Sequence, residues 1–134
     1  EDVLTWSDGR AIVATGSPFQ PVTLNGTTYT IAQSNNSYIF PGVGLGVIVA
    51  ESARVTDEMF AVAARTLADM CTNDDLAMGR IYPSLSRIRE VSQAIAVAVA
   101  TLAWDQGLAS RERPASIADA VREAMYVPEY HSLV

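Results

Sequence analysis

The sequence predicts an α/β chain in which short strands and a hairpin are followed by a mainly helical segment. The chain has 134 residues, of which 49% are hydrophobic, which is enough for one globular unit with a buried core. Up to Phe40, short apolar segments with a period of about two are separated by turn residues. Beyond Phe40 the period changes to about 3.6, and no further strand pattern follows. This change predicts the order of strands first and helices second.

The first part of the chain contains a strand and a hairpin. Residues 11–14 (Ala-Ile-Val-Ala) are a short buried-strand candidate, and Gly16 with the following Ser17-Pro18 ends it. Residues 22–24 and 28–30 flank Asn25-Gly26, a dipeptide that tolerates positive φ and favours a tight hairpin. If the first strand is parallel, Gly16 lies at its carboxyl end, where open α/β sheets bind their ligands. An ordinary turn is the alternative for this glycine.

The second part predicts several helices. Pro41 begins the first, over residues 41–53, and Thr56 caps the second, over residues 57–70. The apolar stripe expected on the second helix comprises Phe60, Ala63, Ala64, Leu67 and Cys71.

A short turn over residues 74–77, capped by Asn73 and closed at Gly79, leads into the extended residues 80–83. A long helix over residues 84–106 ends before Gly107, and its apolar middle indicates a buried or interface position. The last helix spans residues 116–125, with Ser116 and Asp119 resembling a capping box.

Composition excludes several kinds of partner. The net charge is −6 and every basic residue is an arginine, which argues against nucleic acid as a partner and excludes lysine chemistry within the chain. The longest apolar runs, residues 39–50 and 95–104, are shorter than the roughly 18 residues that a membrane helix needs. A single cysteine excludes an internal disulfide and fits a reducing compartment. We therefore expect no membrane partner and a cytoplasmic location.

The usual catalytic residues are scarce. His131 lies near the chain end, where a surface role is expected, and Cys71 closes a helical stripe as a small apolar residue. The glycines of residues 42–46 lack the spacing of a dinucleotide fingerprint, so we interpret them as sites of close helix packing. The acidic pairs 57–58 and 74–75 fall in first turns of helices, where they complement the dipole. We predict neither a catalytic residue nor a metal ligand in this chain.

The most informative feature is the pair Asn35-Asn36, where a polar loop meets the apolar run that begins the first long helix. Neutral amides bind a carboxylate or carboxamide without adding charge, and the N–H groups of a helix that begins at Pro41 favour anions. The sequence therefore predicts a small organic acid as the ligand. A turn that tolerates left-handed φ is the alternative for the two asparagines.

Several segments together resemble the C-terminal part of a malic enzyme, the family that oxidatively decarboxylates malate to pyruvate with NAD or NADP and a divalent metal. The resemblance covers nearly all of residues 8–134, in the family's order. The segments that carry it are residues 9–19 (Gly-Arg-Ala-Ile-Val-Ala-Thr-Gly-Ser-Pro-Phe), 35–42 (Asn-Asn-Ser-Tyr-Ile-Phe-Pro-Gly), 56–57, 79–83 and 88–92.

The resemblance implies an organisation and a site. Residues 1–35 would complete a Rossmann-type NAD(P)-binding domain, residues 36–126 would form a helical return to the catalytic domain, and residues 127–134 would be a C-terminal tail. Asn35 and Asn36 would bind malate, whereas Gly16, Ser17 and Asn36 would contact the cofactor.

The catalytic groups and the ligands of Mg²⁺ or Mn²⁺ would precede Glu1, so we expect a fragment that does not turn over malate alone. Its partners would be malate or pyruvate, the remainder of the enzyme and further copies in a homo-oligomer. Two alternatives are a non-catalytic helical assembly module and a fragment of another α/β dehydrogenase.

Overall fold

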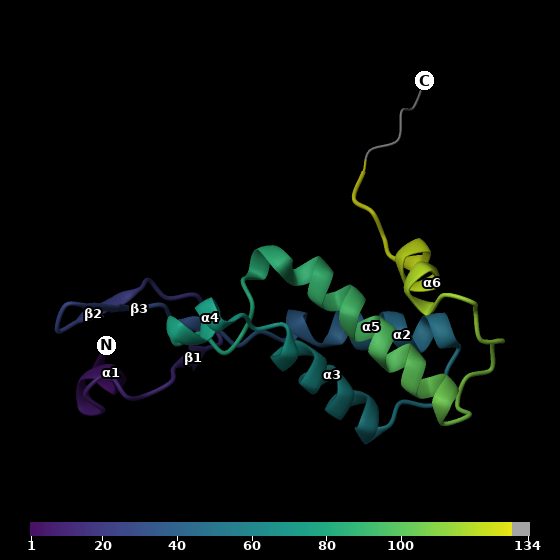
Figure 1. Cartoon of the computed structure of the whole chain (residues 1–134), viewed down its shortest axis with the longest axis horizontal. Coiled ribbons are helices and arrows are strands. Elements are labelled where there is room, and N and C mark those ends of the chain that lie inside the picture. Colours follow the sequence, from purple (N-terminus) through teal and green to yellow (C-terminus); the bar gives the residue numbers. More distant parts are fainter. Residues whose placement is uncertain (130–134) are drawn as a thin grey trace.

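The computed structural model describes residues 1–129 as a mixed α/β chain (Figure 1). The short strands and the first helix lie at one end, and the long helices pack together at the other. The helices and strands are, in order, α1 Asp2–Trp6, β1 Ala14–Thr15, β2 Val22–Leu24, β3 Thr27–Tyr29, β4 Ala32–Gln33, η1 Asn36–Tyr38, α2 Phe40–Ala50, α3 Asp57–Asp69, α4 Asn73–Ala77, η2 Leu85–Arg87, α5 Ile88–Asp105 and α6 Ile117–Ala124.

The predicted hairpin is confirmed, whereas the strand predicted over residues 11–14 is shorter and begins later. β2 and β3 pair antiparallel, and Asn25 and Gly26 between them have φ values of 51° and 80°. Of residues 11–14 only Ala14 lies in a strand, because β1 begins there and pairs parallel with β4. The short helix α1 was not predicted, since its few residues carry no clear helical period.

The core forms where α2 crosses α5, and it depends on two of the predicted packing glycines. A Cβ atom at Gly46 would lie 2.7 Å from the carbonyl oxygen of Ala96, and a Cβ atom at Gly42 would meet Ser92 and Ile95 equally closely. Because a glycine carries only a hydrogen atom where other residues carry a Cβ atom, the two helices can approach each other this closely. The third glycine, Gly44, faces open space.

The apolar stripe predicted for α3 is partly wrong. Ala63 and Leu67 are buried as expected, but the residue that anchors the start of the helix is Met59, which is fully buried. Phe60 is 41% exposed and packs edge-on against Phe40, outside the core. The period of 3.6 fits both faces over so short a helix, and packing against α5 decided between them.

Several helix ends differ from the prediction for local reasons. α2 stops at Ala50 rather than at residue 53, because Glu51 adopts a left-handed conformation with φ 49°. Thr72, not Asn73, caps α4 and forms a capping box with Asp75. The long helix begins at Ile88 after the 3₁₀ turn η2, and Gly107 follows its end with the expected positive φ of 65°.

The last helix, α6, packs on α2 and α5 and has the predicted cap at Ser116. The carboxylate of Asp119 binds Arg122 instead of completing a capping box. None of the helices within residues 1–129 combines the length and apolar character that a bilayer crossing requires. His131 lies outside the described residues.

Candidate functional site

A cavity of about 300 Å³ opens beside the Asn35-Asn36 pair, which meets the first condition for a ligand site. One wall comes from the loop that contains the two asparagines, a second from α3 and a third from the extended segment before η2. The lining residues are Ser34, Asn35, Asn36, Tyr38, Ile39, Ala64, Leu67, Ala68, Ile81 and Tyr82. Polar groups therefore face a largely apolar hollow, as a small organic ligand requires.

The parallel pairing of β1 with β4 positions the loop that carries Asn35 and Asn36, which we call the asparagine corner. Thr15 pairs with Gln33, so the residues that follow the two strands emerge at the same edge of the sheet. The Ser34 N–H donates to the Thr15 carbonyl at 2.8 Å, and the Gln33 side chain donates to the Gly16 carbonyl at 3.1 Å. The carboxyl ends of parallel strands are where α/β sheets bind ligands, so the two predicted site segments share that edge.

Hydrogen bonding fixes the orientation of the Asn35 side chain. Its Oδ1 accepts from the Ser37 N–H at 2.9 Å, which makes Asn35 the cap of η1. This bond uses the acceptor end of the amide, so the NH₂ group is the end that can donate to a carboxylate. Asn36 follows as the first residue of η1 and is exposed.

The backbone at the start of α2 continues directly from η1. Ile39 N–H donates to the Asn36 carbonyl at 3.0 Å, and Val43 N–H donates to the Ile39 carbonyl at 3.0 Å. Pro41 has no N–H group. Residues 40–42, the first of α2, are not among the residues that line the cavity, whereas Asn35 and Asn36 are, so the side-chain amides are the better-placed donors at this site.

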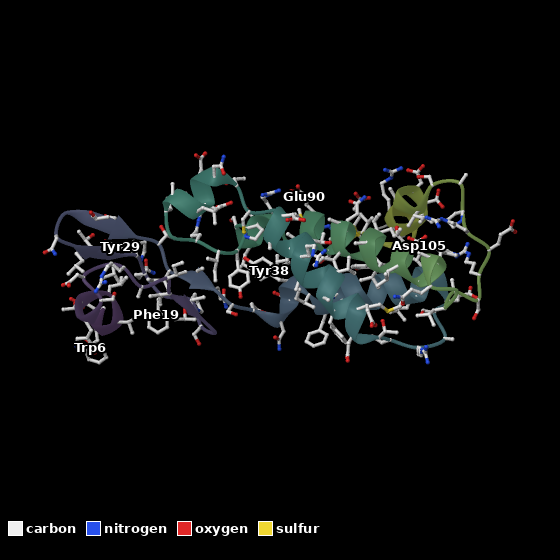
Figure 2. All side chains as sticks on the ribbon, turned by 60° about the horizontal axis from the view of Figure 1, so that its bottom comes forward. Trp6, Phe19, Tyr29, Tyr38, Glu90 and Asp105 are labelled. Carbon is white, nitrogen blue, oxygen red and sulfur yellow. The ribbon has the colours of Figure 1, made fainter. Side chains whose placement is uncertain are left out.

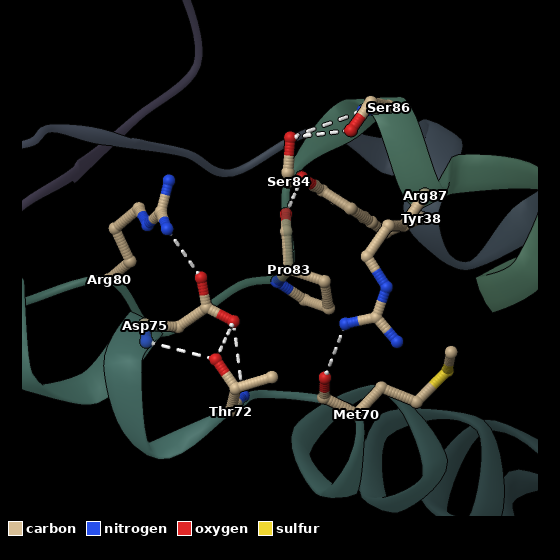
Figure 3. A network of polar contacts seen from close by, with 9 residues as sticks. All are labelled: Tyr38, Met70, Thr72, Asp75, Arg80, Pro83, Ser84, Ser86 and Arg87. Atoms are coloured by element: carbon tan, nitrogen blue, oxygen red, sulfur yellow. Dashed lines mark hydrogen bonds and ion pairs between the residues drawn. The ribbon is translucent and has the colours of Figure 1, made fainter.

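Tyr38 and the segment around Tyr82 form the floor of the corner. Tyr38 is 2% exposed, and its hydroxyl donates to the Pro83 carbonyl at 2.5 Å (Figure 3). Its ring stacks on Tyr82 with centroids 5.5 Å apart and an interplanar angle of 15°. The Tyr82 hydroxyl lies 3.3 Å from Ser34 Oγ, next to the asparagines. Figure 2 places Tyr38 where the strand-containing end meets the helices.

Burial raises the pKa of the Tyr38 phenol, and the nearby Cys71 thiol and Asp75 carboxylate add to the shift. The group therefore remains a protonated donor at neutral pH. The sequence alone assigned no role to Tyr38 or Tyr82, because the two tyrosines are far apart in the chain. Two signals were present: both tyrosines lie in segments that resemble malic enzymes, and Tyr82 precedes a proline, which disfavours the helical region.

The Asp75 carboxylate holds the beginning of the segment that contains Tyr82. The Asp75 carboxylate accepts from the Thr72 N–H at 3.0 Å and from the Thr72 hydroxyl at 2.8 Å, and it pairs with Arg80 at 2.6 Å (Figure 3). The Thr72 hydrogen bonds, followed by the Arg80 charge, hold the pKa of Asp75 below its usual value. This arrangement fixes Arg80, three residues before Pro83.

Gly16 and Ser17 lie at the same sheet edge but are not among the residues that line the cavity. Both are exposed, and a Cβ atom on Gly16 would meet nothing within 4 Å. The fold itself therefore does not require a glycine at position 16. An open backbone at a strand end fits the approach of a flat cofactor ring.

Metal ligands are not gathered at this site. Within residues 1–129 no three side chains of histidine, cysteine, aspartate or glutamate lie close enough together to hold an ion. The described residues therefore do not fit a divalent metal by themselves.

Comparisons with known proteins point to one family. A family model described as "Malic enzyme, NAD binding domain" matches residues 1–104. The NAD-dependent malic enzyme of Cronobacter sakazakii (strain ATCC BAA-894) is 47% identical over 131 residues, covering 98% of this chain and 23% of its own length.

Two eukaryotic proteins agree. The NADP-dependent malic enzyme of Dictyostelium discoideum is 46% identical over 130 residues, covering 97% of this chain and 24% of its own length. The NADP-dependent malic enzyme 1 of Arabidopsis thaliana is 47% identical over 131 residues, covering 97% of this chain and 22% of its own length. The chain thus spans less than a quarter of the length of these relatives.

Proposed function

Because the chain belongs to the malic enzyme family, we propose that it forms part of the pocket in which malate is oxidatively decarboxylated to pyruvate and CO₂ with reduction of NAD or NADP. The observation that supports this most is the position of Asn35 and Asn36. They line a cavity at the carboxyl edge of a parallel strand pair, where a ligand is expected on physical grounds.

Each site residue then has a defined task. The NH₂ group of Asn35 donates to a carboxylate of malate, since its oxygen is already bonded to Ser37. Asn36 lies between substrate and nicotinamide, and Gly16 and Ser17 border the nicotinamide. The nicotinamide supplies the chemistry of hydride acceptance, whereas these residues bind and orient.

The remaining expectations concern the complete enzyme. Mg²⁺ or Mn²⁺ would be held by other parts of the enzyme, so no step here depends on it. Residues 1–35 would belong to the NAD(P)-binding domain, residues 36–126 to the helical return and residues 127–134 to the tail. The complete enzyme would act as a homo-oligomer in the cytoplasm.

The assembly module is the weaker alternative, because the structure accounts for the long apolar helix without a partner. Val91, Ile95 and Val99 of α5 are fully buried inside this chain. α5 packs against α2, α3 and α6. The apolar character of α5 therefore does not require a second protein.

The substitution Asn35→Ala in a full-length malic enzyme that carries this segment tests the proposal. We expect a roughly tenfold or greater rise in the KM for malate or fall in kcat, as for the loss of one hydrogen bond to a charged group. Gln106→Ala is the matched control, because it removes an exposed amide beyond the far end of α5. Unchanged malate kinetics in Asn35→Ala, with Gln106→Ala also unchanged, would refute the assignment.

A further inference from the structure

Tyr38 joins two segments that lie far apart in the sequence, and one of them carries both site asparagines. Its N–H donates to the Asn35 carbonyl at 3.1 Å, so Tyr38 belongs to the same 3₁₀ turn as Asn36. Its hydroxyl donates to the carbonyl of Pro83, a fully buried residue. A single side chain therefore couples the asparagine corner to the segment before η2.

Tyr82 makes the second connection between the same two segments. Its ring stacks on Tyr38, and its hydroxyl approaches Ser34, the residue directly before Asn35. The corner is thus held on both sides, at Ser34 and at Tyr38. Both tyrosines also line the cavity, so a shift of either ring would change its shape.

The segment that receives these contacts is itself fixed. Arg80 is bound to Asp75, and Asp75 is bound to Thr72 at the start of α4 (Figure 3). The guanidinium of Arg87, the last residue of η2, donates to the Met70 carbonyl at 3.1 Å. Pro83 therefore lies between two anchored residues, and the Tyr38 hydroxyl binds to a support that has little freedom to move.

We propose that Tyr38 and Tyr82 are positioning residues that hold the amides of Asn35 and Asn36 toward the ligand cavity. The inference rests on the proposed function, because the ligand that would report a displacement is malate. Neither tyrosine has to touch malate for this role. Their effect passes through the backbone of residues 34–38.

The substitution Tyr38→Phe tests this in a full-length malic enzyme carrying the segment, because it keeps the stacked ring and removes only the bond to Pro83. We expect the KM for malate to rise by roughly three- to tenfold, which corresponds to the net free energy of one neutral hydrogen bond. The KM for the cofactor should change by less than about twofold. Tyr82→Leu, which removes both the stack and the contact with Ser34 but leaves the Tyr38–Pro83 hydrogen bond in place, should act in the same direction.

Trp104→Phe is the control for stability. It removes a hydrogen bond of the same kind, from an aromatic side chain to the Arg111 carbonyl at 2.8 Å, near the end of α5 that is remote from the cavity. It should lower the melting temperature without altering the KM for malate. A Tyr38→Phe enzyme with that same profile would show a purely structural role and overturn the inference.

A double-substitution cycle separates this inference from the proposed function. If Tyr38 acts through the two asparagines, Tyr38→Phe should change the KM for malate by less than about twofold in an enzyme in which Asn35 and Asn36 are both already alanine. Additive effects would mean that Tyr38 acts elsewhere and would overturn the inference while the asparagine assignment stands. No effect of Asn35→Ala alone would instead overturn the proposed function.

Discussion

Gly42 of α2 lies directly against Ile95 of α5: a Cβ atom on the glycine would be 2.6 Å from the Ile95 Cβ and 2.9 Å from the Ser92 carbonyl oxygen. Neither neighbour is the flexible end of a long side chain, so neither can move aside without a substantial free-energy cost. Since α2 continues directly from the turn that carries Asn36, this contact also fixes the start of the helix relative to the cavity.

The first prediction follows from that contact. Gly42→Ala should destabilise the chain by about 2–3 kcal/mol through overpacking. Gly44→Ala is its control on the same helix, because position 44 is open and alanine favours a helix by up to about 1 kcal/mol. Urea unfolding of both variants measures the difference. Equal stability of the two would contradict the close helix contact.

The second prediction concerns the charge at Asn35. Asn35→Asp keeps an oxygen that can accept from the Ser37 N–H, so the cap of η1 and the stability should be preserved. It removes the NH₂ donor and places a negative charge beside a carboxylate. The KM for malate should therefore rise by more than roughly tenfold, beyond the effect of Asn35→Ala. Steady-state kinetics on the full-length enzyme measure it, and a KM at or below that of Asn35→Ala would count against the carboxylate contact.

The third prediction concerns the cofactor at Gly16. Because an added Cβ would meet nothing in the chain itself, Gly16→Ala should leave the melting temperature unchanged. If a nicotinamide ring approaches this backbone, the methyl group should weaken cofactor binding by about 1–3 kcal/mol. Titration of the full-length enzyme with NADH or NADPH gives the affinity. Tight binding that persists in the variant would remove Gly16 from the cofactor site.

The fourth prediction is a pH dependence of stability from Asp75. Because its pKa is lowered in the folded chain, the carboxylate stabilises the fold above the unfolded pKa of about 3.9, and this contribution is lost as the pH falls through the folded value. Asp75→Asn should lower stability near pH 7 by about 1–3 kcal/mol, and the deficit should shrink below about pH 4. Thermal unfolding at several pH values tests this. A deficit of constant size down to pH 2 would contradict it.

The fifth prediction is that the 134-residue chain alone does not oxidise malate. The resemblance to malic enzymes implies that the catalytic groups lie elsewhere in the enzyme, the chain contains no lysine, and its described residues gather no metal ligands. An assay with malate, Mn²⁺ and NAD or NADP should show no reduced cofactor above background. Turnover by this polypeptide alone would show that the chemistry lies within it.

Local sequence patterns determined the elements whose causes are local. The Asn25-Gly26 turn, the glycine that follows α5 and the serine that caps α6 were all predicted, because each depends on the backbone freedom or side-chain oxygen of one or two residues. Where two neighbouring residues offer similar chemistry, as Thr72 and Asn73 do, the capping bonds to Asp75 were needed to choose between them.

The sequence by itself determined that the short strands precede the long helices, that Gly42 and Gly46 have a packing role and, through its resemblance to malic enzymes, the family. Only the tertiary structure decided which face of α3 is buried and that Tyr38, Tyr82 and Pro83 support the asparagine corner. The physical reason is distance along the chain. A cap or a turn is encoded by adjacent residues, whereas a bond across 45 positions, such as Tyr38 to Pro83, exists only after the segments have packed.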